Sequence, residues 1–326
     1  MNNPARVLLV VLPWASLCVA QNPLTIPNGL PSWAFNIPDK VQPPSEEPKG
    51  MLRAPGSAKE YDWAKVAGNA NPPDWFPEEH PPAPRAVKGE AGANLAACGS
   101  CHLMSGQGHP ESADIAGMPA EYLIRQMQYF KSGARKDDVR MGPIAKATSD
   151  EDVRQAAEYY AAIKPIPWVK VIETNTPPRT YINSAGRHHI PYPDGSTEPI
   201  GHRIIQTPQD AFRLAIRDPH SGFIAYVPPG SIARGEQLVK WGTTNGSGAS
   251  GKTIQCDLCH GDGLKGLGEV PRLAGLQPVY IARQLLTMQN GTSAGKAAAL
   301  MKKVVANLTE DDVIAISAYL GSLPPQ

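Results

Sequence analysis

Two short cysteine motifs, separated by half the chain, constrain this sequence more than any other feature. Residues 98–102 read CGSCH and residues 256–260 read CDLCH. Two thiols three positions apart at a helix start can each add to one vinyl group of a haem, and the adjacent histidine then lies under the iron. The motifs therefore predict two haem c groups. The predicted attachment residues are Cys98, Cys101, Cys256 and Cys259, and the predicted proximal ligands are His102 and His260.

Other uses of paired cysteines fit less well. A disulfide within a CxxC pair closes a small, strained and reactive ring rather than a structural cross-link. A zinc ribbon has its two pairs about 15–20 residues apart, whereas Cys101 and Cys256 are separated by half the chain. A thioredoxin-like motif belongs to a βαβ pattern, which this sequence lacks, and needs no histidine after both pairs.

Residues 1–20 read as an export signal. Arg6 supplies a positive charge, an apolar run follows from Val7 to Val19, and small residues precede Gln21. The run is too short to span a bilayer. We therefore expect cleavage before Gln21, which also removes the fifth cysteine, Cys18. A retained anchor and a lipoprotein site at Cys18 are the alternatives.

The charge balance is even. The sequence carries 31 basic and 30 acidic residues, and loss of Arg6 with the signal makes the two equal. No basic excess points to nucleic acid or to an anionic membrane surface. The chain is expected in the periplasm with no transmembrane segment after signal cleavage.

The segments that follow the two motifs resemble each other. Residues 122–127 read YLIRQM and residues 280–285 read YIARQL, and their apolar residues recur with a helical period. Each predicted helix ends at a glycine suited to a C-terminal cap, Gly133 or Gly291. The repeat indicates duplication of one small all-α unit.

A further helix is predicted near the end of each copy. Ser149 and Thr309 can serve as N-caps, and three acidic residues follow each of them in the first turn. The order of motif, helix, loop and capped helix thus occurs twice.

A haem iron with one histidine takes a sixth ligand or keeps an open position. Met141 and Met301 are the only methionines that coincide between the copies, each in the predicted loop before the last helix. We predict them as the second axial ligands, because histidine–methionine ligation raises the potential and suits an electron carrier. Met127 and Met288 lie within apolar helix stripes, where core packing is the commoner role.

Few other histidines could serve as the second axial ligand of either haem iron. No histidine follows His260, and His109, only seven residues after His102, is the rival of Met141. The remaining histidines are expected in solvated surface positions; they are His80, His188, His189, His202 and His220.

With these motifs the sequence resembles the class I cytochromes c, and among them the tandem dihaem proteins of the cytochrome c4 type. The resemblance covers residues 86–164 (the first repeat) and 231–326 (the second repeat). It implies an all-α fold of two cytochrome c domains, each wrapping one haem. It also implies that a proline carbonyl orients the proximal histidine; Pro271 matches that position, and Ala113 occupies it in the first repeat.

Two regions depart from that family. Residues 21–85 form a Pro/Trp-rich N-terminal extension, and residues 165–230 form a long connection, here called the inserted segment. The chain holds 34 prolines, which disfavour regular helices there. Aromatic and β-branched residues such as those of 223–227 are uncommon in disordered chains, so we expect extended segments packed over the haem domains.

These features together predict a periplasmic electron carrier rather than an enzyme. The two haems would form a relay between a donor dehydrogenase and an acceptor cytochrome or oxidase, and the two domains would pack together. A permanently bound subunit of a dehydrogenase is the first alternative, with residues 21–85 as a docking strap. A dihaem peroxidase is the second, although it would need an open iron position.

Overall fold

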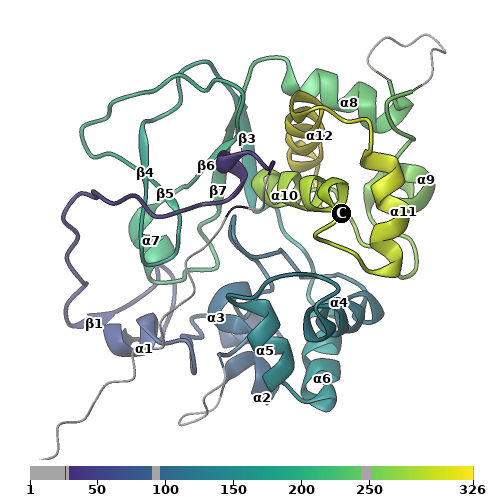
Figure 1. The fold of residues 1–326 in the computed structure, drawn as a ribbon. Coiled ribbons are helices and arrows are strands. Elements are labelled where there is room, and N and C mark those ends of the chain that lie inside the picture. Colours follow the sequence, from purple (N-terminus) through teal and green to yellow (C-terminus); the bar gives the residue numbers. More distant parts are fainter. Residues whose placement is uncertain (1–25, 27–28, 90–95, 244–250, 326) are drawn as a thin grey trace, which may run out of the picture.

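The computed structural model describes residues 26, 29–89, 96–243 and 251–325. The predicted signal, residues 1–20, lies outside them. The described residues form twelve α-helices, three short 3-10 helices and seven strands. The chain is therefore mainly helical (Figure 1).

The helices fall mostly within the two repeats. They are α1 (Trp63–Ala67), α2 (Arg85–Lys88), α3 (Gly99–His102), α4 (Ala120–Ser132), α5 (Met141–Ala147), α6 (Asp150–Ala161), α7 (Ala211–Ala215), α8 (Ser231–Trp241), α9 (Asp257–His260), α10 (Pro278–Asn290), α11 (Lys296–Val305) and α12 (Glu310–Ser322). The 3-10 helices are η1 (Ser32–Ala34), η2 (Pro77–Glu79) and η3 (Asp262–Leu264).

The strands lie in the N-terminal extension and in the inserted segment. They are β1 (Met51–Leu52), β2 (Tyr61–Asp62), β3 (Val169–Glu173), β4 (Thr180–Ile182), β5 (His189–Pro191), β6 (Ile205–Pro208) and β7 (Phe223–Val227). The strands thus lie in the two segments that were expected to be extended, outside the helical repeats. Alternate residues of β7 are buried, a period of two that suits a strand and not a helix.

The predicted helix ends are confirmed. Gly133 and Gly291 end α4 and α10 in the left-handed conformation, with φ of 77° and 86°. Ser149 and Thr309 accept hydrogen bonds from the backbone N–H groups of the residues three positions later, at 3.1 and 3.3 Å. In each repeat the capped helix packs against the preceding long helix, α6 on α4 and α12 on α10.

The inserted segment builds a small sheet beside the second repeat. Strand β7 pairs in parallel with β3 and antiparallel with β6, while β4 and β5 form a separate antiparallel hairpin. Both β3 and β7 contact α12.

One apolar core, here called the main core, runs through both repeats. It includes Tyr160 of α6 and Leu320 of α12. Buried polar contacts also join the repeats, because the Gln277 side chain donates to Asp114 at 2.8 Å and Arg272 donates to the Ala116 carbonyl. The two repeats are thus packed on each other.

A second, small core ties the N-terminal extension to the inserted segment. Its buried members are Leu52, Ala54, Val66, Trp75, Phe76 and Ile216. The Trp75 indole N–H donates to the Ile216 carbonyl at 2.8 Å, which satisfies the polar atom of a buried aromatic ring. The two segments outside the repeats are therefore one packed unit.

Candidate haem-binding sites

Both cysteine motifs adopt the same single helical turn. In α3 the His102 N–H donates to the Cys98 carbonyl at 2.9 Å, and in α9 the His260 N–H donates to the Cys256 carbonyl at the same distance. Residues three and four apart on a helix share one face. Each turn therefore presents two thiols and an imidazole together.

The two motif histidines are held alike. His102 Nδ1 lies 2.8 Å from the Ala113 carbonyl oxygen, and His260 Nδ1 lies 2.8 Å from that of Pro271. A carbonyl only accepts, so Nδ1 carries the proton and Nε2 keeps its lone pair for a metal. Burial lowers the pKa of both histidines, which favours this neutral ligand form. The orienting group is backbone, so alanine serves as well as proline.

A cavity of about 810 Å³ adjoins the first motif. Cys98, Cys101, His102 and Met141 all line it, so the structure brings together the four site residues predicted for this repeat. Further lining is largely apolar and includes Leu123, Met127, Phe130, Ile144, Val153 and Tyr160. The volume falls in the range of cofactor sites, and the apolar walls suit a porphyrin.

A bare metal ion fits this site less well than a haem. Two cysteines and one histidine leave the fourth position of the site to the Met141 thioether, whereas zinc sites are built from Cys, His, Asp or Glu ligands. No cluster of three or more His, Cys, Asp or Glu side chains suited to a metal ion occurs in the described part of the chain. The donor set, two thiols with one imidazole and one thioether, matches a covalently attached haem.

Met141 and Met301 lie on helices, so the expectation of a loop is wrong. Met141 is the first residue of α5, and Met301 lies in the second turn of α11. The segment around Met301 reads KAAALMKKVV, and its alanines and lysines are strong helix formers. Cys256 and Met301 of the second repeat are both partly buried and pack against the main core.

His109 lies near the first site but does not line its cavity. Its Nδ1 accepts from the Glu111 N–H at 3.2 Å, and its Nε2 lies 3.1 Å from the Ser112 hydroxyl. Both ring nitrogens are therefore engaged within the loop. This arrangement favours Met141 over His109 as the second ligand.

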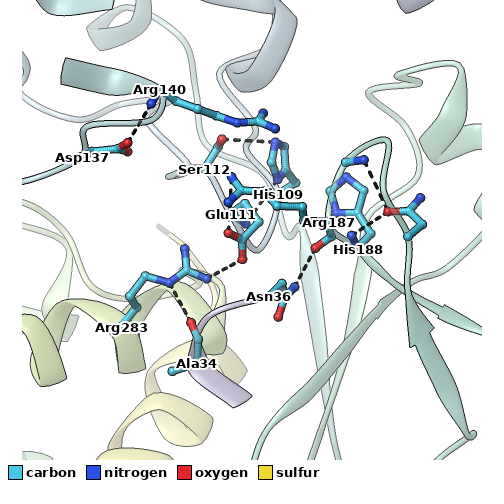
Figure 2. A network of polar contacts seen from close by, with 12 residues as sticks. Ala34, Asn36, His109, Glu111, Ser112, Asp137, Arg140, Arg187, His188 and Arg283 are labelled. Carbon is cyan, nitrogen blue, oxygen red and sulfur yellow. Dashed lines mark hydrogen bonds and ion pairs between the residues drawn. The ribbon is translucent and has the colours of Figure 1, made fainter. Parts of the chain in front are cut away.

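His188 contradicts the expectation of a solvated surface residue. It is 7% exposed, and its ring packs edge-on against His109 with ring centroids 4.7 Å apart (Figure 2). The inserted segment folds over the first repeat and carries His188 inward. Burial lowers the pKa of His188 to about 3, so the ring is neutral.

The polar wall of the first cavity was missed by sequence reasoning. Glu111, Arg187 and Arg283 line it together, although they come from the first repeat, the inserted segment and the second repeat (Figure 2). Arg283 donates to Glu111 at 2.5 Å, and Arg187 lies 3.7 Å from the same carboxylate. Residues so far apart in sequence carry no local pattern that could have linked them.

The surroundings of the two motifs differ. Ser100, between the cysteines of the first motif, is 7% exposed, whereas its counterpart Leu258 is 65% exposed. The Asn69 carbonyl of the N-terminal extension accepts from the Ala97 N–H at 2.8 Å. Arg217 of the inserted segment donates to Asn69 and Gly68. Among the described residues, the segments outside the repeats thus contact the first motif, whereas Leu258 and Cys259 of the second motif are exposed.

Comparison with known proteins supports a haem protein. The chain is 28% identical over 233 residues to a thiosulfate dehydrogenase electron acceptor of Thiomonas intermedia, covering 70% of this chain and 79% of that protein. It is 24% identical to a cytochrome c4 of Pseudomonas aeruginosa, with coverage of 71% and 86%. It is 35% identical over 89 residues to cytochrome c-554(547) of Halothiobacillus neapolitanus, covering 24% of this chain and 98% of that protein.

A solved structure shares the fold. The thiosulfate dehydrogenase of Marichromatium purpuratum aligns with a TM-score of 0.50 at 23% identity, over 74% of this chain and 39% of that one. No protein-family model matches the chain. None of the helices in the described ranges is both long enough and apolar enough to cross a membrane. The turn geometry, the donor set and the relatives agree, and the chain belongs to the c-type cytochromes, as a tandem dihaem electron-transfer protein of the cytochrome c4 type with two haem c groups.

Proposed function

We propose that the chain is a periplasmic electron carrier whose two repeats, residues 86–164 and 231–326, are two cytochrome c domains. The covalent attachment residues are Cys98, Cys101, Cys256 and Cys259, and the axial ligands are His102, Met141, His260 and Met301. The observation that carries the proposal is the single cavity in which Cys98, Cys101, His102 and Met141 meet.

The bound haem supplies an iron that exchanges one electron between its ferric and ferrous forms. The chain supplies the surroundings. Carbonyl groups of Ala113 and Pro271 fix the two imidazoles, and apolar side chains form much of the lining of the first cavity. Thioether ligation and an apolar lining both favour the ferrous form and so raise the potential.

The main core holds the two sites in one body. Helix α10 of the second repeat contributes Tyr280, Arg283 and Gln284 to the wall of the first cavity. Residues of one repeat therefore complete the site of the other. This packing supports a relay, which needs two redox centres at short and constant separation.

The named relatives suggest the donor. Two of them are called thiosulfate dehydrogenase electron acceptors, from Thiomonas intermedia and Stutzerimonas stutzeri. We propose that this chain accepts electrons from a dehydrogenase of the same kind and passes them to a downstream cytochrome or oxidase. The exposed second motif, with Leu258 at its surface, is where a partner would approach.

The packing of the N-terminal extension favours a carrier over a permanent subunit. Trp75 is buried in the small core, and the Trp33 indole N–H donates to Glu310 of the second repeat at 2.5 Å. These aromatic side chains are engaged within their own chain. A strap reserved for another protein would leave such anchors free.

Reduction by a dehydrogenase tests the function. The protein would be produced with haem attachment machinery, weighed to count its haems, and mixed with thiosulfate dehydrogenase and thiosulfate in a stopped-flow spectrometer. Rapid reduction of two low-spin haems is expected. A colourless protein would refute the haem sites, and a high-spin ferric haem with peroxide turnover would replace the carrier by a peroxidase. Reduction only by other dehydrogenases would refute the proposed donor alone.

A further inference from the structure

We propose that the inserted segment supplies an anion-binding residue to the first haem site: Arg187, together with Arg283, binds the propionate carboxylates of the haem in the first cavity. This inference rests on the proposed haem attachment at the first motif. Arg187 acts here as a positioning residue, and it lies outside the repeats that carry the haem motifs.

The backbone at Arg187 is held in an unusual conformation. Its φ is 59°, in the left-handed region that residues other than glycine seldom adopt. The Arg187 N–H donates to the Asn183 carbonyl at 3.1 Å, and the Arg187 carbonyl accepts from the Asn36 side chain at 2.7 Å. Strain of this kind persists only where the surroundings fix it, and it often marks a functional position.

The hairpin that carries Arg187 is itself fixed to the N-terminal extension. Arg187 lies in the turn between β4 and β5. The Asp39 carboxylate accepts from the Ile182 N–H at 2.9 Å, and the Gln42 side chain donates to the Ser184 hydroxyl at 2.7 Å. The turn is thus held in place, and the Arg187 side chain, which lines the cavity, lies beside Glu111 (Figure 2).

The Arg187 guanidinium is buried with incomplete partners. The residue is 9% exposed, and its Nε is buried without a hydrogen bond. Its ion pair with Glu111 is long, at 3.7 Å to one carboxylate oxygen, while Arg283 donates to the other oxygen at 2.5 Å. Burial accordingly lowers the pKa of Arg187. A buried cation in this position calls for a further anion, since an unpaired buried charge is costly.

Among the described residues, the carboxylates that favour the charge of Arg187 are Glu111 and Asp137, while Arg140 and Arg283 oppose it as neighbouring cations. His109 and His188 are neutral, because burial lowers the pKa of both. Arg140 lines the cavity as a further cation, and Asp137 accepts from the Arg140 backbone N–H at 2.9 Å. A haem carries two propionate carboxylates. Guanidinium groups form bidentate hydrogen bonds with carboxylates.

Redox titration of Arg187→Gln in the dihaem protein tests the inference. Loss of a cation beside the first haem disfavours the added electron, so the ferrous-to-ferric ratio of that haem should fall about ten-fold at fixed potential, equivalent to about 59 mV. The second haem should not change. The transition of the first haem is identified as the one that a Cys98→Ser, Cys101→Ser variant lacks.

Three further variants control the result. Arg187→Lys should restore part of the shift. Arg179→Gln removes an exposed arginine of the same segment, which lies over the Tyr192 ring, and should leave both potentials unchanged. Glu111→Gln removes the competing carboxylate and should shift the first potential upward. This opposite sign keeps the test valid even where Arg187→Gln fails to fold.

Two outcomes would overturn the inference. The first is a dihaem Arg187→Gln or Glu111→Gln protein whose first potential equals that of the wild type. The second is a wild-type first potential that depends on phosphate concentration, which would place a solution anion beside Arg187. Both differ from failure of the proposed function, which would appear as a missing haem in the wild-type protein.

Discussion

The two cysteine motifs have the same internal geometry and opposite surroundings. Each is one helical turn with its histidine fixed 2.8 Å from a backbone carbonyl. The first turn lies under the N-terminal extension and the inserted segment, whereas Leu258 and Cys259 of the second are exposed. The motif thus determines the ligand turn, and segments outside the repeat determine access to it. We expect the first haem to be the shielded centre and the second to be the one that meets partners.

Removal of a thiol pair should have the largest effect. Cys98→Ser with Cys101→Ser, or Cys256→Ser with Cys259→Ser, should each reduce the mass by one haem and about halve the haem absorbance. The first variant should also unfold at lower temperature than the second, because the cavity of about 810 Å³ within the main core would lose its filling. Mass spectrometry and thermal unfolding measure both. Equal stability of the two variants would contradict the shielded–open comparison.

Loss of a methionine ligand should have the next largest effect. Met141→Ala and Met301→Ala should each remove the weak far-red absorption of one ferric haem and lower its potential by on the order of 0.1 V or more. Met288→Ala serves as the control, because Met288 packs against the main core. A far-red band of full strength in either variant would exclude that methionine from the iron.

The two capping carboxylates, Asp152 and Asp312, should contribute different amounts to the free energy of unfolding. Asp312 has a fully buried side chain; burial opposes its ionisation, but hydrogen bonds from Lys252, Thr309 and Arg234 outweigh burial and hold its pKa at about 2. Its counterpart Asp152 pairs with an exposed arginine. Asp312→Asn should therefore cost about 2 kcal/mol at neutral pH, and Asp152→Asn under about 1 kcal/mol. Urea unfolding at pH 7 measures both.

The contribution of Asp312 to stability should fall at low pH. The Asp312 pKa is lower in the folded chain than its ordinary value of 3.8. The stabilisation is therefore present above pH 3.8 and is lost as the pH falls through about 2. Asp312→Asn should abolish this part of the acid sensitivity. An unchanged slope of stability between these pH values would show that the carboxylate contributes nothing.

Replacement of the orienting proline should have the smallest effect. Pro271→Ala keeps the carbonyl that accepts from His260, and Ala113 already fills this role for His102. The second potential should stay nearly constant, while stability should fall by about 0.4–1 kcal/mol because the unfolded chain gains freedom. Redox titration and urea unfolding test both parts. A large change in potential would show that the ring of Pro271, and not its carbonyl, orients the ligand.

Features that depend on residues close together in the sequence could be predicted from the sequence. The helix caps at Ser149, Thr309, Gly133 and Gly291 depend on a few neighbouring residues, and the structure has them as predicted. The loop predicted at Met301 is a helix instead, because the alanines and lysines of its segment have high helix propensity.

Features that depend on distant contacts escaped the sequence. The strands of the inserted segment are short and form only by pairing with distant strands. Strand β3, for example, pairs with β7 more than fifty residues away. His188 reads as polar, yet packing beside His109 buries it. The pairing of Arg187 and Arg283 with Glu111 joins three regions of the chain. None of these contacts has a local pattern.

The small core also sets an order of events during maturation. Trp75 and Ile216, which close it, are 141 residues apart in the sequence. If the chain is exported from its N-terminus, as we propose, Cys98 and Cys101 would emerge before Ile216. We expect the attachment machinery to reach the two thiols at that stage. The cavity residues Tyr280, Arg283 and Gln284 come later still in the chain, so the first site is complete only after the second repeat has been made.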